Sequence, residues 1–230
     1  MTRRLVELSH PIRHGMVTYP GLPGPEIADH LSRADAVGRY AEGTTFQIGR
    51  ITMVSNTGTY LDTPFHRFND GDDLSQVGLE HVADLAGVMI DVPGSTERAI
   101  GPERLDVLDD VDVGGRAVLF HTGWDRHWAT DAYAVDAPFA TRDLAAALAG
   151  RGAALVGIDS VNIDDISAHS GGERPVHTLL LEAGIPIVEH LRGLDALPPS
   201  GFRFHAAPPM VAGMGTFPVR AYAVVADEHD

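Results

Sequence analysis

Short apolar runs rich in β-branched residues recur along the chain, and they constrain its fold more than any other feature of the sequence. Runs of this length, bounded by turn-forming residues, predict β-strands. In the middle of the chain the runs alternate with segments of helical character, whereas both ends look purely β. The predicted strands are Phe46–Val54, Gly87–Val92, Ala117–Phe120, Ala154–Ile158, Ile185–Val188 and Arg220–Val225.

Helices are predicted between several of these strands. Thr141 can cap a helix that ends at Gly150, and Gly184 can end a short helix over Thr178–Ala183. A further helix is predicted over Leu74–Leu85. Two proline-bearing segments, Tyr19–Pro25 and Leu197–Pro209, are expected to be surface connections.

This order of elements predicts an α/β protein with a mixed, barrel-like sheet and flanking helices, a swivelling β/β/α arrangement. The sequence contains no internal repeat and no long Pro/Gly/Ser linker. Residues 1–230 are therefore expected to form a single domain.

The charge of the chain excludes several classes of partner. A net charge of −15 repels nucleic-acid phosphates and anionic membrane surfaces.

The chain has no cysteine, so a metal would be held by His, Asp, Glu, backbone or water. No apolar stretch is long enough to cross a bilayer, and the N-terminal residues do not resemble a secretory signal, so a cytoplasmic location is expected.

Residues 55–66 follow a predicted strand and have the composition of a functional loop. Gly58 permits a positive φ or a close backbone approach, and Pro64 stiffens the turn between Asp62 and His66. The two side chains are therefore expected to converge on one ligand.

A second candidate pair lies downstream, where His177 opens a predicted helix and Glu189 ends the strand after it. One imidazole with the carboxylates of Asp62 and Glu189 forms a ligand set suited to Zn²⁺ or Mn²⁺. Taken alone, a His or Glu beside an apolar run is more often a hydrogen-bonded structural or surface residue than a ligand.

The chain resembles the cyclase superfamily that includes bacterial kynurenine formamidase and isatin hydrolase. The signature of that family is H-x-G-T-H-x-D-x-P-x-H, and residues 56–66 match it except that Asn56 and Tyr60 replace the first two histidines. The resemblance covers nearly the whole chain. It continues through Leu8-Ser9, Tyr19-Pro20-Gly21, Thr122-Gly123-Trp124, Gly157-Ile158-Asp159-Ser160, His177-Thr178-Leu179-Leu180, Gly184 to Glu189 and Pro208-Pro209.

The resemblance implies a divalent metal bound by Asp62, His177 and Glu189, with His66 as the acid/base group. In the family, the two missing histidines and the signature Asp bind a further metal. An amide is a weak ligand and a phenol usually stays protonated, so one metal per chain, no metal, or two metals with Asn56 and Tyr60 as unusual ligands all stay open.

The function implied is metal-assisted hydrolysis of an aryl formamide or cyclic amide of the N-formylkynurenine type, a C–N bond other than a peptide bond. His66 would move the proton, and Tyr60 and Asn56 would donate hydrogen bonds to the oxyanion. Phe65, Phe68, Trp124 and His121 are candidates for lining the substrate pocket. One alternative is a cyclase or dehydratase acting on a carbonyl compound, and another is a metal-free small-molecule binding protein. By analogy with the family, a homodimer or homotetramer is expected.

Overall fold

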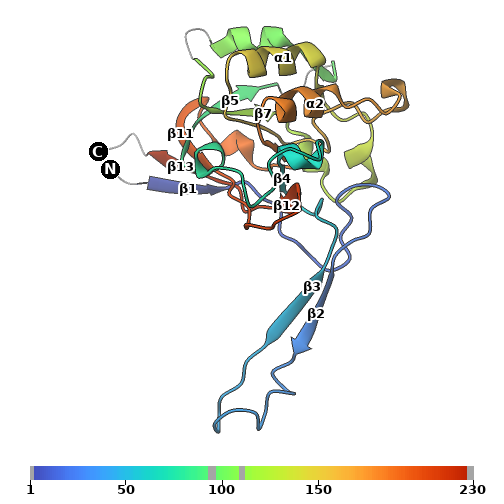
Figure 1. The fold of residues 1–230 in the computed structure, drawn as a ribbon, viewed down its shortest axis with the longest axis vertical. Helices are drawn as coiled ribbons and strands as arrows, with labels where there is room; N and C mark the ends of the chain where they lie inside the picture. The colour runs from blue at the N-terminus through green and yellow to red at the C-terminus, as the bar shows by residue number, and fades with distance from the viewer. Residues whose placement is uncertain (1–2, 93–96, 109–111, 227–230) are drawn as a thin grey trace.

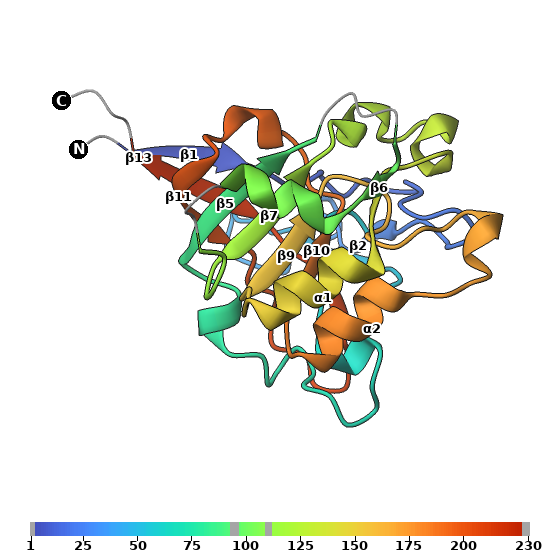
Figure 2. The same cartoon turned by 90° about the horizontal axis from the view of Figure 1, so that it is seen from above.

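The computed structural model describes residues 3–92, 97–108 and 112–226 and contains a nine-stranded mixed sheet (Figures 1 and 2). The strand order is β1 (Arg3–Glu7), β13 (Tyr222–Ala226), β11 (Ser200–His205), β5 (Leu85–Asp91), β7 (Ala117–His121), β9 (Leu155–Ile158), β10 (Ile187–Glu189), β4 (Tyr60–Asp62) and β12 (Thr216–Pro218).

The centre of this sheet is parallel and its two sides are antiparallel. Strands β5, β7, β9 and β10 run parallel, and every other neighbouring pair in the sheet is antiparallel. Strands β1 and β4, which precede β5, and strands β11, β12 and β13, which follow β10, add to the outer sides, as expected from the purely β ends of the sequence. The sheet curls like half of a barrel, so the predicted mixed α/β fold class is confirmed.

Helices α1 (Arg142–Gly150) and α2 (Pro175–Glu182) cover the same face of the sheet (Figure 2). Side chains alternate between the two faces of each strand. In β7, Val118 and Phe120 pack in the core under the helices, whereas Leu119 packs in a second core on the other face. Thr141 accepts a hydrogen bond from the Leu144 amide and caps α1, as predicted.

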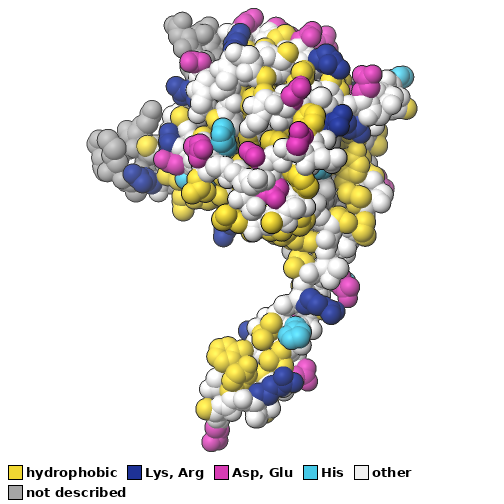
Figure 3. All heavy atoms as spheres, in the orientation of Figure 1, with side chains coloured by type: hydrophobic (Ala, Val, Ile, Leu, Met, Phe, Trp, Pro, Cys, Tyr) yellow, Lys and Arg dark blue, Asp and Glu magenta, His cyan; other side chains and the backbone are white. Residues whose placement is uncertain are grey.

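Strands β2 (Glu26–Leu31) and β3 (Ile48–Thr52) form a hairpin that projects from the body as a long arm (Figure 1). All five residues of β3 are exposed. Figure 3 shows hydrophobic side chains gathered on this arm. The remaining elements are short: β6 (Ala99–Ile100), β8 (Phe139–Ala140), and the 3₁₀ turns Pro64–His66, Leu79–His81, Pro102–Leu108, Trp124–His127, Asp131–Ala134, Ala168–Ser170 and Leu194–Ala196.

The structure corrects three predictions of secondary structure. Leu74–Leu85 is not a helix, because the Asp73 carboxylate accepts from the Ser75 amide in a local turn and Gly78 is extended. The strand predicted over Phe46–Val54 is shorter and lies in the arm, outside the large sheet. The segment Leu197–Pro209 contains strand β11, whose Phe202 and Phe204 alternate with exposed residues. No helix in the described residues is both long and apolar enough to span a bilayer.

Candidate active site

Strands β4 and β10 bring three of the predicted site residues to one face of the sheet. The two strands are antiparallel neighbours, and Tyr60 lies opposite Glu189. Because side chains alternate along a strand, Tyr60, Asp62 and Glu189 point toward the face that carries α2, while Leu61 and Val188 enter the opposite core. Asp62 and Glu189 are both buried.

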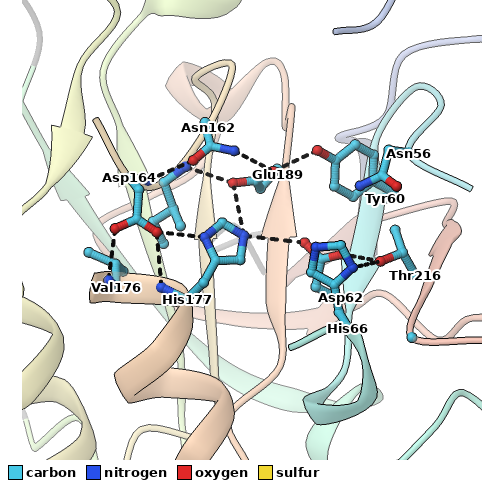
Figure 4. Close-up of polar contacts among 12 residues, drawn as sticks. Asn56, Tyr60, Asp62, His66, Asn162, Asp164, Val176, His177, Glu189 and Thr216 are labelled. Atoms are coloured by element: carbon cyan, nitrogen blue, oxygen red, sulfur yellow. Dashed lines mark hydrogen bonds and ion pairs between the residues drawn. The ribbon is translucent and has the colours of Figure 1, made fainter. Parts of the chain in front are cut away.

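Helix α2 supplies the imidazole that faces these carboxylates (Figure 4). His177 is held by Asp164, whose carboxylate accepts hydrogen bonds from the amides of Val176 and His177. The same carboxylate contacts His177 Nδ1 at 2.6 Å. An ionised carboxylate only accepts, so Nδ1 carries the proton and Nε2 is turned toward β4 and β10.

His177 Nε2 lies between the two strand carboxylates. It is 3.7 Å from Asp62 Oδ2 and 3.7 Å from Glu189 Oε1. Asp62 Oδ2 is buried and makes no hydrogen bond within the described part of the chain. The structure therefore brings together the three predicted metal ligands, although 110 residues separate His66 from His177 in the sequence and gave no indication of distance in space.

Thr216, at the start of edge strand β12, joins Asp62 to His66. Its hydroxyl bonds to Asp62 Oδ1 and lies 2.8 Å from His66 Nδ1. The close approach of the two segments requires a glycine at position 215, since a Cβ there would collide with the His66 backbone.

The Thr216 contacts fix the tautomer of His66. A hydroxyl has one proton, and an ionised Asp62 only accepts, so Thr216 donates to Asp62 and accepts from His66 Nδ1–H. The lone pair of a neutral His66 is then on Nε2. His66 is 36% exposed, which leaves this ring accessible to a substrate.

Tyr60 and Asn56 occupy the positions where the family signature has histidines. The Tyr60 hydroxyl donates to Glu189 Oε2 at 2.7 Å, and Glu189 Oε1 accepts from the Ile163 amide at 2.7 Å. Burial, followed by the charges of Glu189 and Asp62, raises the pKa of Tyr60 well above its usual value, while the Asn56 amide opposes that rise. Tyr60 therefore stays a neutral donor that holds Glu189.

The electrostatics of the site favour a cation. Burial alone would lower the pKa of His177, but the carboxylates of Asp164, Asp62 and Glu189 raise it to about 10. Burial raises the pKa of Glu189 to about 7, although the His177 charge opposes the rise. Burial alone would raise the pKa of Asp62, but the charges of His177 and His66 and the hydrogen bond from Thr216 lower it.

The residues present fit a divalent metal ion. Three buried carboxylates surround the His177 imidazole. A single imidazolium cannot balance their negative charge, and burying uncompensated charge is costly. A separation of 3.7 Å between Nε2 and each carboxylate oxygen is close to that of two ligands on one Zn²⁺ ion. One potential ligand atom each of Asp62, His66 and His177 lies within 4.8 Å of the others, so His66 is also near enough to coordinate.

Two segments quoted for the family resemblance meet at Asp159. Its carboxylate accepts from the Thr122 amide, the Thr122 hydroxyl and the Gly123 amide. Burial raises the pKa of Asp159 to about 6, although these hydrogen bonds oppose the rise. Their role is to hold the loop after β7 against the end of β9.

The side chains suggested for the substrate pocket do not line the cavity beside His66, and this holds for Phe65, Phe68, Trp124 and His121. Phe68 packs against the core under the helices, and Trp124 packs with Tyr133 in a separate small cluster. His121 pairs with Asp91 at 2.6 Å at the ends of β7 and β5. The cavity beside His66 is lined instead by polar and basic side chains.

Sequence reasoning missed Asp164 and Thr216, which orient His177 and His66. The available signal for Asp164 was its position shortly after Ser160, where a segment that resembles the family ends. Thr216 carries no such signal, because its contact with Asp62 depends on the pairing of β12 with β4.

A family model described as "Putative cyclase" matches residues 6–165. The chain belongs to this family. It is 31% identical over 184 residues to kynurenine formamidase of Geobacillus thermodenitrificans, covering 79% of this chain and 81% of that protein. It is 26% identical over 220 residues to kynurenine formamidase of Bacillus cereus, covering 96% and 97% of the two proteins.

A solved structure of isatin hydrolase A from Ralstonia solanacearum shares the fold of this cyclase-family chain. The TM-score is 0.83 at 23% identity, and the match covers 97% of this chain and 92% of that one. The resemblance to the cyclase family and the predicted fold are confirmed by these matches.

Proposed function

We propose that this cyclase-family chain is a metal-assisted hydrolase of aryl formamides or cyclic amides, with substrates of the N-formylkynurenine type. The orientation of His177 carries the proposal, because its Nε2 faces two buried carboxylates while Asp164 holds its Nδ1. A hydrolase acting on amide C–N bonds agrees with the activity named for the kynurenine formamidase relatives.

One divalent ion, Zn²⁺ or Mn²⁺, would be held by Asp62, His177 and Glu189. Such an ion polarises a carbonyl and lowers the pKa of water. Asn56 and Tyr60 supply no imidazole for a second ion, and the Tyr60 proton is bonded to Glu189. These contacts support a single ion per chain.

His66 is the proposed acid/base group. Thr216 holds Nδ1, so Nε2 can take a proton from water and return it to the leaving nitrogen. The Asn56 amide and the Tyr60 hydroxyl are proposed to donate hydrogen bonds to the oxyanion. The Tyr60 hydroxyl already donates to Glu189, so the oxyanion would have to compete with Glu189 for this hydrogen bond.

The test combines elemental analysis with turnover. Purified protein is expected to carry one Zn or Mn per chain, and N-formylkynurenine or isatin should be hydrolysed by metal-restored but not by metal-stripped protein. No turnover of either compound in either state would refute the proposal. Incorporation of ¹⁸O from solvent into the product separates a hydrolase from a cyclase or dehydratase.

We also propose that the chain assembles with copies of itself through the β2–β3 arm. An isolated two-stranded hairpin is at best marginally stable in water. Exposed apolar residues along this one are Ile27, Val37, Tyr40, Phe46, Ile48 and Ile51. A second copy is the partner that is always present, and closed two-fold pairing would cover both arms.

The cytoplasmic location stays a prediction that cell fractionation tests.

A further inference from the structure

An open depression of about 510 Å³ lies beside His66. This volume is within the range of small-molecule sites. Three of its lining side chains are arginines, Arg67, Arg142 and Arg174, and Glu173 is the single carboxylate among them. The rim of the depression therefore carries a net positive charge, although the whole chain has a net charge of −15.

Two of these arginines are held in place without a carboxylate partner. Arg174 Nη1 donates to the backbone carbonyls of Glu173 at 2.8 Å and Asp165 at 3.3 Å. Arg67 Nε lies 3.4 Å from the Thr178 hydroxyl, and its guanidinium lies 5.4 Å from the centre of the Phe68 ring. Across residues 3–92, 97–108 and 112–226, none of the three lining arginines forms an ion pair. Their charge is available to a ligand.

We propose that Arg67, Arg142 and Arg174 receive the carboxylate of an anionic amide substrate whose scissile carbonyl lies beside His66. A guanidinium matches a carboxylate in planar shape and in hydrogen-bond geometry, and it keeps its charge at any working pH. All 17 basic residues of the chain are arginines, and three of them surround this one depression. The inference rests on the proposed amide hydrolysis and names the substrate class that this site selects.

The experiment compares two formamides that differ only in a carboxylate, 2-formamidobenzoate and formanilide. The measured quantity is the ratio of kcat/KM for the anionic to the neutral compound. We expect R67Q and R174Q each to lower this ratio at least 10-fold, mainly through KM for the anion, with partial recovery in R174K. Raising the salt concentration should lower the wild-type ratio.

R151Q is the matched control, because Arg151 follows the last residue of α1, at the opposite end of that helix from Arg142. It should keep the wild-type ratio. An unchanged ratio in both R67Q and R174Q overturns the inference while leaving amide hydrolysis intact.

A binding measurement separates this inference from the proposed function. If wild-type protein hydrolyses neither formamide and neither N-formylkynurenine nor isatin, the proposed function fails, and calorimetry with 2-aminobenzoate and aniline decides the role of the arginines. Tighter binding of 2-aminobenzoate that weakens at least 10-fold in R174Q, but not in R151Q, supports the carboxylate site. Equal binding of the two compounds, or equal binding to wild type and R174Q, overturns it.

Discussion

His177 and Asp164 form a buried pair in which Nδ1 of the imidazole contacts the carboxylate at 2.6 Å. The pair fixes the ring so that Nε2 faces Asp62 and Glu189. A carboxylate behind a metal-binding histidine sets its tautomer and raises its basicity. Asp164 therefore belongs to the candidate site even though it contacts Nδ1, on the other side of the ring from Asp62 and Glu189.

The first prediction concerns this pair. D164N should weaken metal binding by about 10- to 100-fold, because the amide no longer favours the tautomer with a free Nε2. Competition with a chromophoric chelator measures the affinity. D91N is the control, since Asp91 and His121 form a pair of the same 2.6 Å length away from the site. Equal losses in D164N and D91N would contradict the assignment, as would metal retention in H177A.

The second prediction concerns metal stoichiometry. The double variant N56H/Y60H restores both histidines of the family signature and removes the hydrogen bond from Tyr60 to Glu189. We expect elemental analysis to rise from one to two ions per chain, while Y60F stays at one. Two ions in the wild-type protein would show that Asn56 and Tyr60 are ligands after all.

The fold class was predictable because periodicity and turn residues mark β5, β7, β9 and α1 in the sequence. The short strands β4 and β12 were not, since each has three residues and owes its conformation to pairing within the sheet. The residues of the candidate site divide in the same way, into those that the sequence predicts and those that it does not. Asp62, His177 and Glu189 follow from a local motif and a resemblance, whereas Thr216 enters through a contact with a residue 154 positions away in the sequence.

The third prediction tests the role of Thr216. T216V keeps the shape of the side chain but removes the hydroxyl that fixes the His66 tautomer, so kcat should fall by about 100-fold, the lower end of the range for a general base. T63V is the control, because among the described residues the Thr63 hydroxyl donates to the Gly215 carbonyl alone, at 3.2 Å. It should cost about 1 kcal/mol of unfolding free energy and leave kcat near the wild-type value. A similar kcat in T216V and T63V would contradict the role.

The fourth prediction concerns stability in acid. His190 is fully buried, and burial, followed by the charge of His10, lowers its pKa to about 3. The unfolded chain takes up this proton near pH 6.5, so the stabilisation is complete above that pH and is lost as the pH falls toward 3. Between pH 7 and pH 5 this one group should remove about 2 kcal/mol from the free energy of unfolding.

Urea unfolding of metal-free protein at the two pH values measures this loss. H190N is the test variant, because asparagine tolerates the positive φ of 57° at this position. Its stability should depend less on pH than that of the wild type. The same slope in both proteins would show that His190 is not responsible.

The last prediction concerns the arm. Ile27 and Ile51 are cross-strand partners on β2 and β3, with exposed fractions of 43% and 47%. The double variant I27T/I51T keeps β-branched residues but removes apolar surface, so light scattering should show a dimer or tetramer becoming a monomer. R50T, on the opposite face of β3, is the control and should keep the wild-type mass. A monomeric wild type would refute assembly through the arm. An unchanged oligomer in I27T/I51T would place the contact away from this cross-strand pair.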